Sequence, residues 1–146
     1  MKKIALLALL AAATTLAGLH ATADGGRNFI TGLVGSEEIP GPGDPDGSGI
    51  AVITVNAGQG QVCWRIVEVK NIAPATAAHV HVGDAGVAGP VVVGLSPPTG
   101  GVSEGCRDVS KELAQAIKND PEHYYVNVHN PEFPAGAIRG QLSRTP

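Results

Sequence analysis

The sequence predicts an all-β fold, an antiparallel Greek-key β-sandwich or barrel of about seven strands with one short helix. Short runs of Val, Ile, Leu and Ala recur along the chain, and stretches rich in Gly, Pro, Asp and Ser separate them. One segment repeats its apolar residues at helical spacing. Aromatic residues make up only 3% of the chain, so we expect aliphatic side chains to build the core.

The predicted strands are short and follow one another closely. They cover 27–34, 50–56, 62–72, 78–83, 90–95, 124–129 and 137–142. In the third of them Cys63 and Trp64 fall on opposite faces, and we expect the indole to face the core. The alternation loses phase near Glu68 and Val69, which predicts a β-bulge there.

The predicted helix lies between the fifth and sixth of these strands. Its apolar positions are Val109, Leu113 and either Ala116 or Ile117. Asp108 is placed to cap its start, and Asn119 with Pro121 is placed to end it. Because a short helix is marginal alone, it must pack on the sheet.

Residues 1–23 have the pattern of a signal peptide. Lys2 and Lys3 precede an uncharged apolar run, and Ala21 to Ala23 gives the small residues of a cleavage site. We expect cleavage after Ala23, a single domain over 24–146, a periplasmic or secreted location and no membrane anchor after cleavage. A retained N-terminal anchor is the alternative, although the apolar run is short for a span.

The charge of the predicted mature chain argues against nucleic acid as a partner. Loss of Lys2 and Lys3 leaves 8 of the 10 basic residues against 13 acidic ones, a formal charge of −5. Nucleic-acid binding depends on clustered Lys and Arg, which this balance does not favour.

Cys63 and Cys106 are the only two cysteines, and an exported chain favours one disulfide between them. The Pro-, Gly- and Ser-rich stretch 96–106 is predicted to be a loop that brings Cys106 back over Cys63. A metal site is the competing interpretation, but two cysteines so far apart lack zinc-type spacing.

Three histidines are the candidate metal ligands. His79 and His81 stand two apart on one predicted strand, so both side chains share a face, and His129 lies on the 124–129 strand. Nitrogen ligands of this kind suit copper or zinc. The alternative is that the histidines are structural and satisfy their nitrogens with carbonyls or polar side chains.

Four further residues are predicted to support these ligands. Asn127 shares a face with His129 and could orient an imidazole, while Glu38 or Asp84 could supply a carboxylate. Arg139 is predicted to pair with an acidic side chain such as Glu38 or Glu132. No catalytic nucleophile motif or phosphate-binding loop is visible, so an enzyme is not the favoured class.

Three motifs resemble the CHRD domain, which is named after chordin and occurs in exported bacterial proteins. They are LVGSEEIPG near the start, AHVHVG with the Gly and Pro of 86–90, and YYVNVHNxxFPAGAIRGQL near the end. The resemblance covers about Phe29 to Leu142. It implies a β-sandwich of immunoglobulin-like or superoxide-dismutase-like shape and no established catalytic activity. For chordin it implies extracellular protein binding, so an extracellular protein is the partner expected by analogy.

A looser resemblance is to copper/zinc superoxide dismutase, which has a similar His-Val-His unit on its copper strand. Here His79 and His81 match that unit, and Gly-Asp and Ala-Gly-Pro follow as in that enzyme. Val91 stands where the enzyme has a metal-binding histidine, and 82–122 contains no histidine. A bridged copper and zinc pair would therefore lack ligands. We expect an extracytoplasmic binding or structural role, with copper or zinc binding, in a superoxide-related role or otherwise, as the alternative.

Overall fold

The computed structural model describes residues 26–144, and the predicted signal peptide lies outside them. Residues 26–144 form eight strands, one α-helix and two short 3-10 helices. In order they are β1 (Arg27–Val34), η1 (Gly35–Glu37), β2 (Ser48–Asn56), β3 (Gln61–Lys70), β4 (Ala77–Val82), β5 (Val91–Leu95), β6 (Ser103–Asp108), α1 (Lys111–Asn119), η2 (Pro121–His123), β7 (Tyr124–His129) and β8 (Ile138–Gln141). Within residues 26–144, none of the helices is long and apolar enough to cross a membrane.

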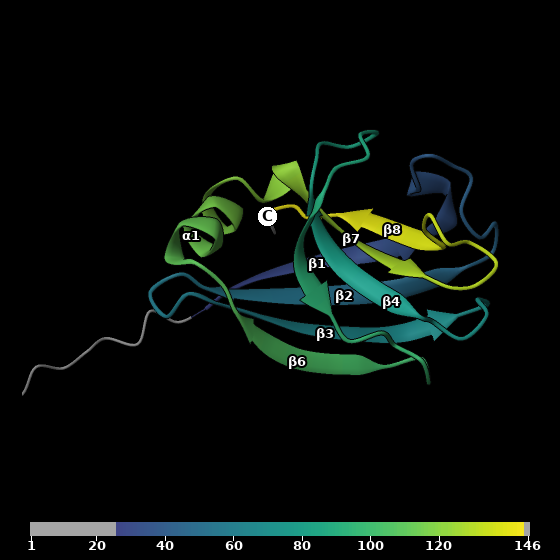
Figure 1. Ribbon diagram of the computed structural model, residues 1–146, viewed down its shortest axis with the longest axis horizontal. Helices are drawn as coiled ribbons and strands as arrows, with labels where there is room; N and C mark the ends of the chain where they lie inside the picture. Colours follow the sequence, from purple (N-terminus) through teal and green to yellow (C-terminus); the bar gives the residue numbers. More distant parts are fainter. Residues whose placement is uncertain (1–25, 145–146) are drawn as a thin grey trace, which may run out of the picture.

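All eight strands join one antiparallel sheet in the order β5-β4-β7-β8-β1-β2-β3-β6. The sheet curls into a nearly closed barrel, so that β4 and β7 face β2 and β3 across the interior (Figure 1). The links from β3 to β4 and from β6 to β7 each cross between the two halves, as in a Greek key. The predicted all-β fold with one short helix is confirmed.

The core is aliphatic, as predicted from the scarcity of aromatic residues. Alternate residues of β2 and β3 are buried, which places one face of each strand in the interior. The fully buried side chains include Phe29, Leu33, Ile53, Ile66, Val80, Val126 and Ile138. The confirmed bulge lies in β3, where the pairing with β2 shifts register and Glu68 has φ 52°.

Strand β6 corrects the prediction that residues up to Cys106 form a loop. Its sequence, SEGCRD, has almost no apolar residues. Among the described strands it lies at the end of the sheet and pairs with β3 alone, where little apolar surface is needed. Gly105 lies opposite Trp64, where a Cβ atom would come within 2.6 Å of the indole ring. The indole is buried as predicted, and its Nε1 donates to Ser103 Oγ at 3.0 Å.

Helix α1 begins two residues later than predicted. Ser110, and not Asp108, is the N-cap, because its side chain accepts a hydrogen bond from the Leu113 amide. The Val109 amide donates to the Gly60 carbonyl, which ties that residue to the turn between β2 and β3. Ala114 and Ile117 face the core, and Figure 1 shows the helix at one end of the barrel.

The disulfide between Cys63 and Cys106 is confirmed. The two residues are directly paired on β3 and β6, with Cα atoms 3.9 Å apart. Cys63 is half-buried on the outer face of the barrel, opposite the face that carries Trp64, as predicted. The bridge therefore joins the end strand β6 to the rest of the sheet.

Candidate metal centre

The candidate centre lies on the outer face of β4 and β7. The residues that alternate with the histidines along β4 and β7, such as Ala78, Val80 and Val128, are fully buried in the core, so the imidazoles lie on the opposite face. His79 on β4 is paired directly with Asn127 on β7, and Ala77 is paired with His129. The three histidines therefore occupy adjacent positions of two neighbouring strands.

The three imidazoles converge. One ring nitrogen from each of His79, His81 and His129 lies within 4.8 Å of the others, and His79 Nδ1 is 3.1 Å from His129 Nε2. Bonds of about 2.0–2.1 Å from a tetrahedral ion place its ligand nitrogens about 3.3 Å apart. The His79 and His129 pair already has that spacing, and His81 would have to approach by at most about 1.5 Å, which is a side-chain movement.

Two backbone carbonyls fix the tautomers of His81 and His129. His81 Nδ1 is 2.8 Å from the Gly89 carbonyl, and His129 Nδ1 is 3.1 Å from the Pro134 carbonyl. A carbonyl only accepts, so each Nδ1 carries the proton and each Nε2 keeps its lone pair. His81 Nε2 is buried and has no hydrogen-bond partner among the described residues.

Burial keeps His79 and His129 uncharged. It lowers the pKa of His79 to about 4, and the neighbouring His129 and His81 lower it further. Burial also lowers the pKa of His129, although the Pro134 carbonyl acts in the opposite direction. His79 and His129 are therefore neutral at pH 7, the form in which imidazole binds a metal.

Tyr125 and Arg139 extend the centre along the same face. The His81 ring stacks on the Tyr125 ring, with centroids 4.8 Å apart and planes 8° apart. The Arg139 guanidinium lies 3.4 Å from the centroid of the same ring. Since β7 lies between β4 and β8, these two side chains reach Tyr125 from strands on either side. Tyr125 alternates in phase with Asn127 and His129, so the sequence pattern could have identified it.

Arg139 attracts the Glu38 carboxyl electrostatically, as predicted, but among the described residues its hydrogen bonds go to backbone carbonyls and to Gln141. Its guanidinium donates to the carbonyls of Val87 and Asp84, both at 3.0 Å, and to Gln141 Oε1 at 3.2 Å. It thereby holds the loop 83–90, which also supplies the Gly89 carbonyl to His81. No sequence signal marks a backbone carbonyl as a partner.

Asp84 lies away from the imidazoles of the centre. Its side chain is exposed and pairs with His123, and this contact raises the pKa of His123. Among the described residues, Asp84 is linked to the side chains around the centre through its backbone carbonyl, which accepts from Arg139. The prediction that Asp84 supplies a carboxylate to the histidine centre is therefore wrong, because this carboxylate pairs with His123 instead.

Glu38 is buried beside Asn127. The segment after η1 folds back on the start of β8, where the Asp44 amide donates to the Ala137 carbonyl at 2.8 Å, and Glu38 is only 2% exposed. Gly136 lies against its carboxyl group, since a Cβ atom there would come within 2.2 Å of Glu38 Oε2. Burial raises the pKa of Glu38 to about 7, although Arg139 and a hydrogen bond from Asn127 oppose the rise.

Glu38 should make folding pH-dependent. Its pKa is about 7 when folded and 4.5 ordinarily, so between these values the folded protein binds the proton more tightly. The stabilising contribution is complete below pH 4.5 and is lost as the pH rises through 7. In metal-free protein, Glu38→Gln should therefore become more stable relative to wild type as the pH rises from 4.5 to 7, measured by urea unfolding.

The control for this comparison is Glu37→Gln, at the exposed neighbouring position. The lowered pKa values of His79 and His129 give the opposite slope, but they are shared by all variants and cancel in the difference. If the difference in free energy of unfolding between Glu38→Gln and wild type stays constant from pH 4.5 to 7, the raised pKa of Glu38 would be contradicted.

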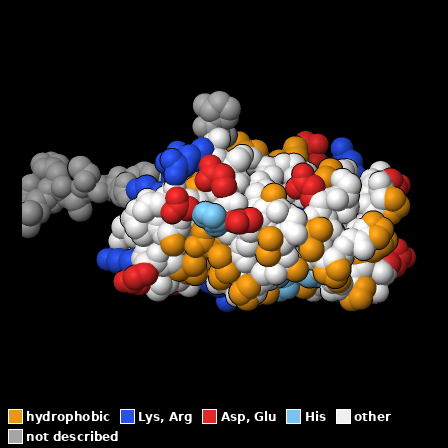
Figure 2. Space-filling view, turned by 90° about the horizontal axis from the view of Figure 1, so that it is seen from above, with side chains coloured by type: hydrophobic (Ala, Val, Ile, Leu, Met, Phe, Trp, Pro, Cys, Tyr) orange, Lys and Arg blue, Asp and Glu red, His pale blue; other side chains and the backbone are white. Residues whose placement is uncertain are grey.

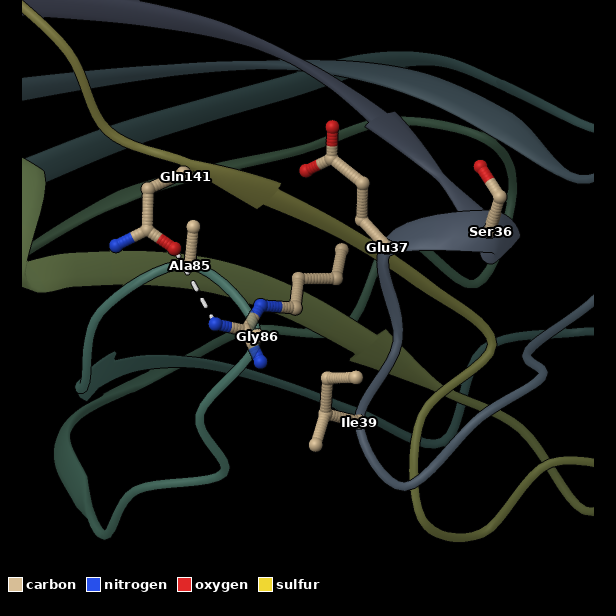
Figure 3. Close-up of a pocket in the computed structure, with 7 residues that line it drawn as sticks. Ser36, Glu37, Ile39, Ala85, Gly86 and Gln141 are labelled. Carbon is tan, nitrogen blue, oxygen red and sulfur yellow. Dashed lines mark hydrogen bonds between the residues drawn. The ribbon is translucent and has the colours of Figure 1, made fainter.

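A shallow cavity of about 330 Å³ lies beside the centre, and the three histidines do not line it. Figure 3 shows it between Glu37 and Ile39 on one side and the loop with Ala85 and Gly86 on the other, with Gln141 bonded to Arg139. The face shown in Figure 2 carries acidic side chains among apolar ones, and most Lys and Arg side chains stand toward its left end. Over the described residues of that face, there is no basic stripe for nucleic acid.

Comparison with known proteins identifies the family. Residues 29–142 match the model of the CHRD domain, and this match spans most of the chain. Searches of curated proteins and of solved structures gave no match. The chain therefore belongs to the CHRD domain family.

Proposed function

We propose that this CHRD-domain protein is exported and that its extracytoplasmic role is to bind one copper or zinc ion through His79, His81 and His129. The observation that carries the proposal is the bonding of the imidazoles. The Nδ1 atoms of His81 and His129 donate to carbonyls, so each Nε2 keeps its lone pair, and His129 Nε2 lies 3.1 Å from His79 Nδ1. Metal-binding histidines commonly donate their second N–H to a carbonyl or carboxylate in this way.

The ligand set supports copper or zinc over other ions. Three imidazole ligands suit zinc and copper, whereas magnesium and calcium prefer oxygen ligands. Three protein ligands also leave one position open in a four-coordinate centre, as in many catalytic zinc sites. The purely structural alternative does not explain why His81 Nε2 is buried and has no hydrogen-bond partner in the described part of the chain.

Export is supported by independent features. Residues 1–23 carry the signal-peptide pattern, and the mature domain would be 24–146. A disulfide and a CHRD domain are compatible with a secreted or extracellular protein. An extracellular protein partner, by analogy with chordin, stays a prediction.

The test is metal stoichiometry. Mature protein without a polyhistidine tag should be stripped with chelator, exposed separately to zinc and to copper, desalted and analysed by elemental mass spectrometry. We expect one ion per chain. His81→Ala should weaken binding by more than about 100-fold, because an outer partner alone is worth roughly 10- to 100-fold.

The matched control is His123→Ala, which removes an exposed histidine that pairs with Asp84 outside the centre. It should bind metal as wild type does. Wild-type protein that retains neither ion at stoichiometric level would eliminate the proposal. Equal weakening by His81→Ala and His123→Ala would show that binding is not at this centre.

A further inference from the structure

The face that carries the histidines holds unpartnered buried acceptors besides the imidazole of His81. Asn127 is 3% exposed and Glu38 is 2% exposed. Asn127 Oδ1 and Glu38 Oε1 are both buried and lack a hydrogen-bond partner among residues 26–144. A buried acceptor without a donor destabilises the folded protein, so these atoms call for a donor.

The position of Asn127 relates these acceptors to the metal centre. Asn127 is paired across the strands with His79 and stands two residues from His129 on the same face. On β4, His81 is the next residue after His79 on that face, which makes it a diagonal neighbour of Asn127. Asn127 therefore adjoins all three imidazoles.

Glu38 is a buried neighbour of the Asn127 amide, which lies close enough to lower the pKa of the Glu38 carboxyl. Asn127 Oδ1 itself has no hydrogen-bond partner among residues 26–144. Arg139, paired with Asn127 from β8, adds a second neighbour on the far side from His79.

We propose that a water molecule occupies the open fourth position of the metal and donates a hydrogen bond to Asn127 Oδ1. This inference rests on the proposed three-histidine site. Water bound to a divalent cation is a strong donor, so it satisfies the acceptor that the protein leaves unpaired. Asn127 is then a positioning residue, and a small molecule that coordinates through one oxygen or nitrogen can replace the water.

The direct test uses wild-type protein loaded with Cu²⁺. Electron paramagnetic resonance spectra are recorded in ordinary water and in water enriched in ¹⁷O. A water on the copper should broaden the hyperfine lines in the enriched sample. Unbroadened lines would overturn the proposal, and because copper would still be bound, the proposed function would stand. Absence of bound copper would instead defeat the proposed function.

The second test uses variants and needs no assumption about spectra. Asn127→Leu keeps a similar volume but removes Oδ1, and Asn127→Asp keeps an oxygen at the same place. We expect Kd for Zn²⁺ to rise about tenfold in Asn127→Leu, and we expect Asn127→Asp to bind at least as tightly as wild type. Stoichiometry should remain one ion per chain in both.

The matched control is Val126→Ala, which lies on β7 beside Asn127 but faces the core. It should lose stability and keep wild-type Kd. Unchanged Kd in Asn127→Leu, or an equal rise in Val126→Ala, would show that Asn127 acts on stability alone. If Asn127→Leu does not fold, the ¹⁷O measurement decides the question.

Discussion

Replacement of Arg139 with Met should lower the free energy of unfolding by about 3–5 kcal/mol. The Arg139 side chain is 1% exposed, and its guanidinium donates to the Val87 and Asp84 carbonyls and to Gln141. Hydrogen bonds from a charged donor are worth about 1.5–3 kcal/mol each. Met fills a similar volume but leaves the loop carbonyls without this donor.

Arg139→Lys separates the charge from the geometry. Lys keeps the positive charge but has no planar fork to reach two carbonyls together and to stack on Tyr125, so we expect it to recover only part of the loss. The measurement is urea unfolding of metal-free protein. Arg65→Met, at an exposed position on β3, is the control and should stay within about 0.5 kcal/mol of wild type.

A loss below about 1 kcal/mol for Arg139→Met would mean that water readily replaces the guanidinium and that the loop 83–90 is held by other contacts. The expected larger loss has a second consequence. The same loop gives the Gly89 carbonyl to His81, so a loosened loop should also weaken metal binding.

The fold was predictable wherever one face of a strand is apolar. β1 and β7 have the predicted bounds, because alternation and flanking turn residues mark both ends. β6 was missed because its own side chains show no apolar alternation. Its pairing with β3 is a contact between distant segments that the local sequence does not reveal. An end strand needs little apolar surface, so periodicity carries no signal there.

The helix start shows the limit of a local rule. Asp108 and Ser110 are both good N-cap residues, and sequence spacing does not choose between them. The choice depends on a contact between distant segments, the bond from the Val109 amide to the Gly60 carbonyl. A pattern in the local sequence around residues 108–110 cannot reveal a hydrogen bond to a residue as distant as Gly60.

The candidate centre was predictable in its side chains and not in its surroundings. The spacing of His79 and His81, and the phase of His129 with Asn127, follow from strand geometry. The carbonyls of Gly89 and Pro134, which set the tautomers, come from loops whose course the sequence does not reveal. For the same reason the sequence could not show that Asp84 turns toward His123.

Replacement of both Cys63 and Cys106 with Ala should destabilise the protein by about 4 kcal/mol. The bridge joins residues 43 apart in sequence, and the closed loop removes that much conformational entropy from the unfolded chain in the chain-entropy model. Beyond this global loss, β6 should also open locally, because its side chains bury little apolar surface and, among the described strands, it pairs with β3 alone.

Two measurements check this expectation. Urea unfolding gives the total loss, and hydrogen exchange of backbone amides locates it. We expect β6 amides in the double variant to exchange faster than global unfolding alone would allow. Amides of β1 and β2, which pair with each other along β1, should still exchange only through global unfolding. Wild-type protein reduced with dithiothreitol should behave like the double variant, since both lack the cross-link. Uniform loss of protection over all strands would show that the bridge acts on the unfolded chain alone and that β3 holds β6 without it.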